Sequence, residues 1–262
     1  MKFTNLFSSS RGNSLLVESE NTKILVDAGL PGSTIVNELK KIDVEISDID
    51  AILITHEHSD HIKGAGVLSR RADIPIYLHR AACDTVLKKV GRVKEENIYR
   101  IEEEIPFYIN DVLVNSFSIP HDAVAPIGFT IDDGKTKCGV ATDMGMIMED
   151  VIENLKECKF VFLEANHDEN MLKKGSYPIH LKQRILSPFG HLSNNDSGKV
   201  LSELIKGKTE RVRLGHLSEE NNISTIAYET VKNVALDSDI KEGKDYILDV
   251  ANRIGINGIL EF

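Results

Sequence analysis

Cysteine is scarce in this chain of 262 residues, and tryptophan is absent. The three cysteines, Cys83, Cys138 and Cys158, are too few and too scattered for a disulfide framework. No pair of them has the Cys-x-x-Cys spacing of a zinc or redox site. These absences exclude a small disulfide-stapled fold, and we expect three reduced thiols in or near the core.

Long apolar runs and an excess of basic residues are also missing. No stretch approaches the ~18 consecutive apolar residues of a membrane span. Residues 1–10 lack the apolar core and cleavage site of a signal peptide, so we expect a soluble, cytoplasmic protein without a membrane partner. The 31 basic and 41 acidic residues give a formal net charge of −10. Because this charge repels polyanions, any binding of nucleic acid must be local.

Nothing in the composition marks a linker or an internal repeat, and we predict one domain over residues 1–262. Short apolar runs bounded by turn residues predict strands at 2–7, 14–18, 23–26, 49–54, 76–78, 112–119, 128–131, 137–141, 160–163, 211–214, 246–249 and 258–262. Longer segments predict helices at 31–41, 62–71, 81–90, 148–156, 179–186, 194–205 and 222–236. Ser193 and Ser218 are expected to cap the last two helices. The mixture indicates two sheets with helices outside them.

The strongest functional signal follows the aliphatic run 49–54, which ends in Thr55-His56-Glu57-His58-Ser59-Asp60-His61. Residues two apart in an extended loop point the same way, so His56 and His58 can converge on one point. Asp60 and His61 then turn toward a neighbouring point. Imidazole and carboxylate ligands suit Zn, Mn or Fe, and the lack of cysteine ligands disfavours a closed structural zinc site. The loop therefore predicts an open, reactive metal centre.

This loop resembles the His-x-His-x-Asp-His signature of the metallo-β-lactamase-fold hydrolases. The family's later elements follow in order, as Ile119-Pro120-His121-Asp122, Thr142-Asp143-Met144-Gly145 and Leu214-Gly215-His216-Leu217. The resemblance implies an α/β fold, the αββα sandwich of two mixed β-sheets with helices on the outer faces and metals at one edge. It also implies that Asp27, in Val26-Asp27-Ala28-Gly29, braces the metal loop.

The family pattern implies two divalent metal ions, Mn or Zn, with Fe as a further candidate. One ion would be held by His56, His58 and His121, and the other by Asp60, His61 and His216, with Asp143 bridging them. Asp60 counts as both a metal ligand and a candidate catalytic residue. A hydroxide shared by the two ions would attack a phosphodiester, because paired cations lower the pKa of water and offset the phosphate charge. Since His61 is present and no cysteine lies near a ligand, the resemblance does not extend to true β-lactamases.

The wider sequence is similar to the bacterial YycJ (WalJ) subfamily over nearly the whole chain. Besides the metal loop, the shared segments are Ser10-Arg11-Gly12-Asn13-Ser14, Glu164-Ala165-Asn166-His167-Asp168 and Gly190-His191-Leu192-Ser193-Asn194. This similarity implies a metal-dependent exonuclease that degrades DNA from 5′ ends, with a link to mismatch repair. One departure is Ser9, where the subfamily usually has glycine.

Two further histidines, His167 and His191, follow or precede predicted elements, where sites are commonly built. Each is a candidate catalytic residue that touches substrate phosphate or protonates the leaving group, or else a hydrogen-bonded structural residue. We expect the basic clusters Lys173-Lys174 and 182–184, which lie between these histidines in sequence, to flank the cleft. Lys88-Lys89 is expected to lie away from it.

Other functions stay open on the residues alone. The same scaffold supports an RNase Z-like endoribonuclease or a glyoxalase II-like thioesterase. A non-catalytic regulatory module that keeps the metal site for stability is a third reading. The complete and open ligand set favours an enzyme.

Overall fold

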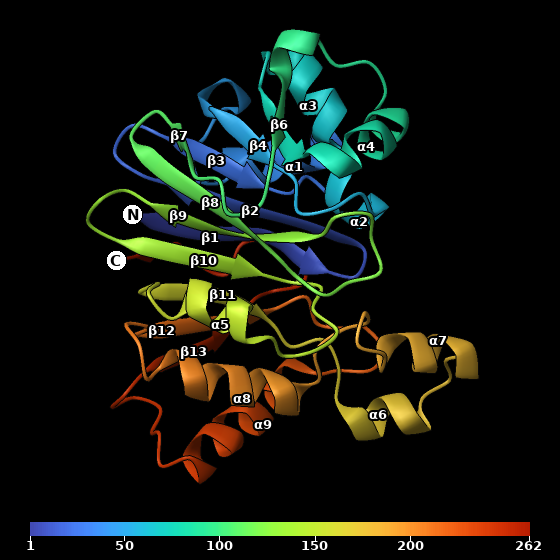
Figure 1. Ribbon diagram of the computed structural model, residues 1–262, viewed down its shortest axis with the longest axis vertical. Helices are drawn as coiled ribbons and strands as arrows, with labels where there is room; N and C mark the ends of the chain where they lie inside the picture. Colours follow the sequence, from blue (N-terminus) through green and yellow to red (C-terminus); the bar gives the residue numbers. More distant parts are fainter.

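The computed structural model describes residues 1–262 and contains two seven-stranded sheets, packed face to face between two layers of helices (Figure 1). This is the αββα arrangement that the sequence predicted. The first sheet has the order β14-β1-β2-β3-β4-β5-β6 and the second β13-β12-β11-β10-β9-β8-β7. Each sheet combines parallel and antiparallel pairs, so both are mixed.

The strands of the first sheet are β1 (Lys2–Ser9), β2 (Gly12–Glu18), β3 (Lys23–Val26), β4 (Ala51–Leu53), β5 (Ile76–His79), β6 (Ile98–Ile101) and β14 (Leu260–Glu261). Those of the second are β7 (Phe107–Ile109), β8 (Val112–Ser118), β9 (Ile127–Asp132), β10 (Lys137–Ala141), β11 (Phe160–Glu164), β12 (Arg211–Gly215) and β13 (Ile247–Val250). The first sheet is covered by α1 (Gly32–Lys40), α3 (Ala65–Ala72) and α4 (Cys83–Val90). The second is covered by α5 (Glu149–Leu155), α8 (Asn194–Leu204) and α9 (Ser224–Asp237).

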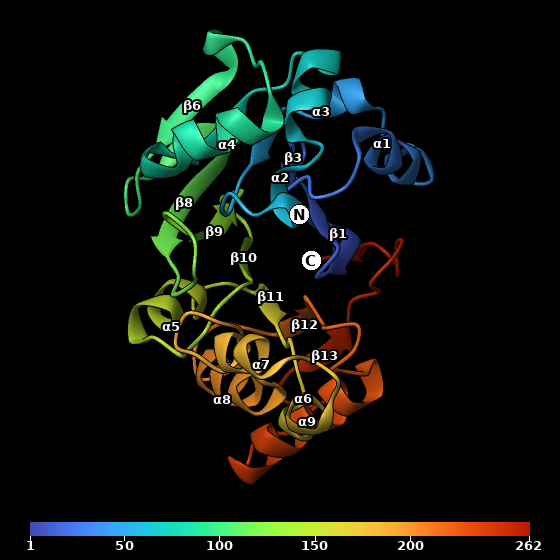
Figure 2. The same ribbon diagram turned by 90° about the vertical axis from the view of Figure 1, so that its right-hand side faces the viewer.

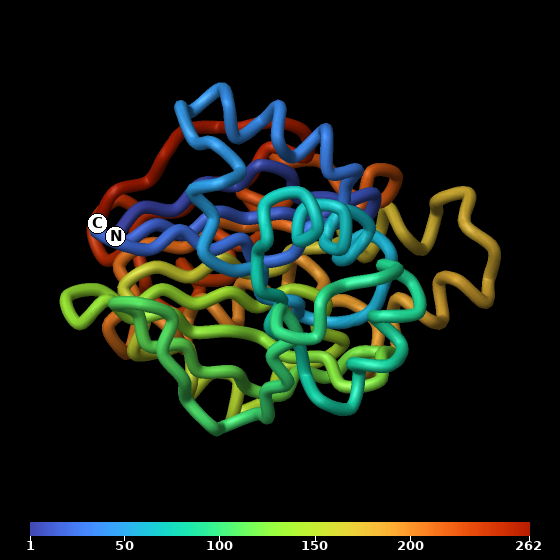
Figure 3. The backbone as a smooth tube through the Cα atoms, turned by 90° about the horizontal axis from the view of Figure 1, so that it is seen from above, coloured from blue at the N-terminus to red at the C-terminus, as the bar shows by residue number.

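Three short helices lie at one edge of the sandwich: α2 (Ser59–Ile62), α6 (Glu169–Lys174) and α7 (Ile179–Ile185). Helices α6 and α7 form a hairpin that stands out from the body of the molecule, as Figure 3 shows from above. Short 3₁₀ turns occur at Ile46–Asp48, Arg80–Ala82 and Glu95–Asn97. No helix combines the length and the apolar character that crossing a membrane requires.

Apolar side chains fill three layers. The middle layer lies between the sheets and includes Phe3, Phe129, Phe160 and Phe162, which are essentially inaccessible to solvent. The outer layers join each sheet to its helices, through residues such as Leu39 in one and Leu201 in the other. All three cysteines are buried and unpaired, as predicted.

The strand directions bring the carboxyl ends of many strands to a single edge of the sandwich. Strands β3 to β6 run parallel in the first sheet, and β10 to β13 run parallel in the second. Strand β8 points the same way as β10 because both are antiparallel to β9. Figure 2 faces the edge where their carboxyl ends meet. The loops of that edge therefore bring together residues that are far apart in sequence.

Several predicted boundaries differ from the structure. The predicted helix 62–71 is split into α2 and α3 near Gly64, where a Cβ atom would lie 2.3 Å from the carbonyl oxygen of Leu30. Ser193 does cap α8, because its Oγ accepts a hydrogen bond from the Asp196 amide at 3.1 Å. The prediction for Ser218 is wrong: its hydroxyl accepts from the Asn221 amide in the preceding turn, and the last long helix follows Ile223.

Candidate metal centre

The residues of the predicted metal loop lie at the carboxyl edge of the first sheet. His56 and His58 follow β4, and Asp60 and His61 lie in the first turn of α2. From the second sheet come His121 after β8, Asp143 after β10 and His216 after β12. The two sheets thus supply opposite sides of one site.

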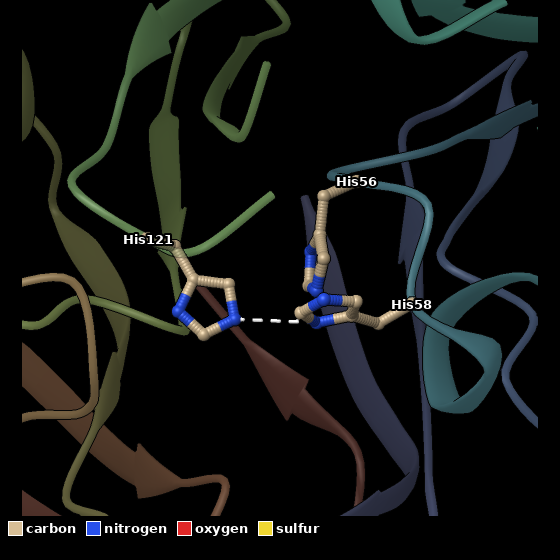
Figure 4. Close-up of side chains that lie close together, drawn as sticks. All are labelled: His56, His58 and His121. Carbon is tan, nitrogen blue, oxygen red and sulfur yellow. Dashed lines mark hydrogen bonds between the residues drawn. The ribbon is translucent and has the colours of Figure 1, made fainter. Parts of the chain in front are cut away.

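His56, His58 and His121 form the first cluster (Figure 4). Nε2 of His121 lies 3.3 Å from Nδ1 of His58, and the His56 ring lies about 5.0 Å from the His121 ring, centroid to centroid. One potential ligand atom from each residue lies within 4.8 Å of the others. Ring nitrogens that face one another at this distance suit a shared cation, because they cannot all donate protons to each other.

The second cluster contains Asp60, His61 and His216, again within 4.8 Å. Asp143 lies between the clusters: its Oδ2 is 3.3 Å from Nε2 of His61 and its Oδ1 is 3.7 Å from Nε2 of His121. The structure therefore brings together all seven residues that the sequence nominated as ligands. The central carboxylate reaches toward both groups.

In three of the histidines, the Nδ1 atom contacts a carboxylate or carbonyl oxygen outside the ligand set. Nδ1 of His61 lies 2.7 Å from the Asp27 carboxylate, and Nδ1 of His121 lies 3.0 Å from the carbonyl oxygen of Gly190. Nδ1 of His216 lies 2.9 Å from the Glu164 carboxylate. Such partners fix the ring orientation and leave Nε2 for a metal.

Several buried atoms that face the centre of the site form no hydrogen bond with the protein. Nε2 of His56, Nε2 of His216 and Oδ2 of Asp143 are buried without a hydrogen bond. Buried polar atoms are normally satisfied, and a set of them converging on one point indicates a missing ligand. Imidazole and carboxylate without thiolate fit divalent Zn, Mn or Fe, so the residues present fit a pair of divalent ions.

Mutual charge sets the protonation of the cluster. Burial alone would lower the pKa of His216, but Asp143, Asp60 and Glu164 raise it to about 10. Burial alone would raise the pKa of Asp60, but the nearby rings of His216 and His61 bring it well below its usual range. The carboxylates thus remain ionised and attract positive charge to the site.

The segment after β3 braces the metal loop, as the resemblance implied for Asp27. The Asp27 carboxylate accepts hydrogen bonds from the amide and hydroxyl of Thr55, at 2.9 and 2.8 Å, in addition to its contact with His61. Gly29 lets the loop approach closely, because a Cβ atom there would lie 1.6 Å from the carbonyl oxygen of Asp60. Glu57 turns away from the cluster, where its side chain accepts from the Val124 amide.

The turn between β1 and β2 reaches the same edge. Asn13 places its side-chain nitrogen 3.2 Å from Nε2 of His61 and 3.1 Å from the carbonyl oxygen of Ser9. Ser9 replaces the usual glycine without strain, because it belongs to β1 and does not adopt a positive φ.

Glu164 is a member of the site that the sequence analysis did not assign. It is fully buried at the end of β11, and its Oε1 lies 2.8 Å from Nδ1 of His191 and 2.9 Å from Nδ1 of His216. Its Oε2 accepts from the amides of Met144 and Leu192. A carboxylate that ends a wholly apolar strand was the signal available in the sequence.

The two further candidate histidines, His167 and His191, have different environments. His191 joins the cluster, with Nδ1 3.6 Å from Oδ1 of Asp143, and its side chain is 12% exposed. His167 is only 1% exposed, and neither of its ring nitrogens has a hydrogen-bond partner. It belongs to none of the groups of potential ligands. Burial lowers its pKa to about 4, so its ring is neutral.

The basic residues near the site agree only in part with those expected. Lys173 pairs with Glu169, and Nζ of Lys182 donates to carbonyl oxygens of residues 173 and 175, which ties α6 to α7. Arg184 lies closer to the centre and forms two hydrogen bonds with Asp122. The expectation for Lys89 is wrong: its Nζ donates to the carbonyl oxygen of Glu57 at 2.9 Å, within the metal loop.

Comparison with known proteins agrees with this geometry. Residues 10–216 match the family model of the metallo-beta-lactamase superfamily. The chain is 38% identical to the exodeoxyribonuclease WalJ of Streptococcus pneumoniae, over 94% of this chain and 92% of that protein. It is 35% identical to the exodeoxyribonuclease YycJ of Bacillus anthracis, over 89% of each. The metallo-beta-lactamase fold protein YhfI of Bacillus subtilis has a similar structure, with a TM-score of 0.73, 16% identity and 99% coverage of both chains.

Proposed function

The chain belongs to the metallo-beta-lactamase superfamily, and from that membership we propose that it is a metal-dependent phosphodiesterase that degrades DNA from 5′ ends. The convergence of the three-histidine cluster and the Asp60–His61–His216 cluster on Asp143 carries this proposal. The names of the two relatives support DNA as the substrate. The direction of attack rests on the subfamily resemblance alone.

In this proposal His56, His58 and His121 hold one divalent ion and Asp60, His61 and His216 hold the other. Asp143 serves as the ligand common to both. We propose Mn²⁺ or Zn²⁺ as the bound ions, with Fe²⁺ as an alternative, since all three accept this ligand set. When bound, the two ions lower the pKa of water and offset the negative charge of a phosphodiester.

His191 is the residue we assign to the leaving group. Its Nδ1 is held by Glu164, which accepts hydrogen bonds from four donors and therefore acts as an ionised carboxylate. The ring is then fixed with its other nitrogen, Nε2, without a hydrogen-bond partner, and Nε2 can donate when both ring nitrogens carry protons. From there His191 can donate a proton to the departing sugar oxygen or a hydrogen bond to a non-bridging phosphate oxygen.

Asp60 is the second candidate catalytic residue. Its carboxylate is 25% exposed and stays ionised, so we propose that it accepts a hydrogen bond from the attacking water and orients that water toward the phosphate. His167 has no place in this scheme because its ring is buried outside the ligand groups. We propose that it has a structural role.

The test uses DNA labelled at either end and incubated with the Mn²⁺- or Zn²⁺-loaded protein. Early release of the 5′ label as short products is expected, with the 3′ label retained on shortening strands. A chromogenic phosphodiester should also be hydrolysed, and S-lactoylglutathione should not. First release of the 3′ label would contradict the direction, and hydrolysis of the thioester without DNA would contradict the substrate class.

A further inference from the structure

A broad hollow adjoins the metal centre on the side of the first sheet. Its volume is about 730 Å³, and it is lined by Ser10, Arg11, Gly29, Ser59, Asp60, Ile62, Lys63 and Lys89. The lining comes from the β1–β2 turn, the segment after β3, α2 and α4. Since Asp60 is a proposed metal ligand, this hollow opens directly onto the site of reaction.

The hollow is positively charged in a chain whose net charge is −10. Three basic side chains line it, and Asp60 is its one acidic residue. A hollow of similar size, about 700 Å³, lies at the opposite edge of the second sheet, where four lysines are balanced by four acidic residues. The cationic lining is therefore a feature of the metal edge, where it offsets the acidic global field locally.

The three basic residues are not equivalent. Arg11 pairs with Glu219 at 2.7 Å, which neutralises part of its charge. Lys63 is exposed, and its side chain forms neither an ion pair nor a hydrogen bond with the protein. Lys89 is fixed by donation to the Glu57 carbonyl oxygen, which leaves its full charge uncompensated. Lys63 and Lys89 are thus available for an anionic ligand.

A second pocket, which shares Ser10 with the hollow and is also lined by His191, offers much less room. The pocket lined by His191, Arg184, Tyr177 and Ser10 has a volume of about 130 Å³. Sites for small organic molecules run from about 300 to 1,000 Å³, so the hollow is large enough for several nucleotide groups and the pocket is not. The hollow therefore has room for the longer part of a strand that crosses the centre, and the pocket does not.

We infer that Lys63 and Lys89 bind the phosphate backbone of the strand that continues beyond the scissile bond, within the hollow. This inference rests on the proposed function and adds the path of its substrate. If degradation starts at a 5′ end, the strand in the hollow is the part 3′ of the scissile phosphate. Affinity should then increase with the length of that part, because each added phosphate meets the cationic lining.

The experiment measures binding of single strands that carry nuclease-resistant phosphorothioate linkages, from a dinucleotide to about a dozen nucleotides. In the variant Lys63→Ala/Lys89→Ala, the ratio of long-strand to dinucleotide affinity should fall at least tenfold. The slope of log affinity against log salt should decrease by about 1.4, since each lost contact on single strands contributes about 0.7. Lys63→Arg/Lys89→Arg should restore both.

The matched control is Lys88→Ala/Lys174→Ala, which removes two exposed lysines. Neither lysine lines the hollow or the pocket at the metal centre, and neither forms an ion pair. It should bind strands of all lengths as the unaltered chain does. Equal losses in both double variants, or an unchanged salt slope in the Lys63/Lys89 pair, would overturn the inference while DNA degradation by the unaltered chain still stood. Failure of the unaltered chain to degrade DNA would instead overturn the proposed function.

Because Lys89 contacts the metal loop, the single variant Lys63→Ala separates charge from structure. It should lower the salt slope by about 0.7 and retain the full metal content. An unchanged slope in Lys63→Ala would count against the proposed path even if the double variant bound DNA poorly.

Discussion

Three residues of the metal centre have left-handed backbone conformations that side chains other than glycine seldom adopt. Asp27, Asp143 and His216 have φ values of 62°, 62° and 55°. Such conformations cost on the order of 1–3 kcal/mol each and persist only where the surroundings enforce them. Asp27 and His216 directly follow strands that end at the metal edge, and Asp143 lies two residues after another such strand. The geometry of the site is thus set by the sheets, at a cost in local stability.

His191 provides the first prediction at the residue scale. His191→Gln should lower kcat by about 10²- to 10⁴-fold, because the ring is the proposed donor to the leaving group. Bound metal should remain at the level of the unaltered protein, since the proposed ligand set does not include this ring. Turnover of labelled DNA and metal analysis on the same samples check both statements. Full activity in the variant would remove His191 from the mechanism.

His167 gives a prediction on pH. Because burial lowers its pKa from 6.5 to about 4, the unfolded chain takes up the proton first as pH falls. The neutral ring therefore contributes its full stability above the unfolded pKa, and this contribution is lost as pH falls from about 6.5 toward 4. Between about pH 7.5 and 5 the metal-free protein should lose about 2 kcal/mol more than His167→Asn does. Urea unfolding at the two pH values measures this difference, and identical losses would contradict it.

At the scale of elements, the strand ends determine which residues meet. The sequence was sufficient to predict the strands that precede ligands, because their apolar runs stop abruptly at histidine or aspartate. Strands β6 and β7 were not predicted, since β6 is half exposed at a sheet edge and β7 has three residues. Helix α6 was also missed, because six residues show too little periodicity. Glu164 was not assigned because its histidine partners lie before α8 and after β12, which no local pattern reveals.

Gly29 tests how closely two elements must approach. In Gly29→Ala the new Cβ would collide with the Asp60 carbonyl, so the metal loop must shift. We expect a loss of about 1–3 kcal/mol in stability and a weaker affinity for metal. Gly32→Ala is the control, because its Cβ would meet only side-chain atoms, at 3.1 Å or more. Denaturation and metal titration of both variants decide the matter, and equal behaviour would count against the close approach.

At the scale of the whole molecule, the two ends of the chain pair with each other in the first sheet. The terminal amine of Met1 donates a hydrogen bond to the carbonyl oxygen of Phe262 at 3.0 Å, and β1 pairs with β14. The two termini accordingly lie close together in Figure 1. Phe3 also packs on Phe160 and Phe162 from the other sheet. The charge pattern of the metal edge emerges only at this scale. Proximity in sequence to His167 favoured Lys173, whereas folding brings Lys89 to the metal loop.

We propose that residues 1–262 form one domain, since the apolar layer between the sheets draws on strands from both halves of the chain. Urea should then unfold the metal-free protein in a single transition that coincides by far- and near-ultraviolet circular dichroism. Phe3→Ala should lower the free energy of unfolding by about 3–5 kcal/mol while keeping one transition. Two separate transitions would indicate that the halves fold independently.

The most direct test of the dinuclear centre is the number of metal ions bound per chain, measured by elemental analysis after loading and removal of free metal. The unaltered protein should hold about two divalent ions, because each cluster has its own ligands. Asp143→Ala should lose most of both, since its carboxylate reaches toward the two clusters, and His61→Ala should keep about one. A single ion in the unaltered protein, or two in Asp143→Ala, would contradict the account.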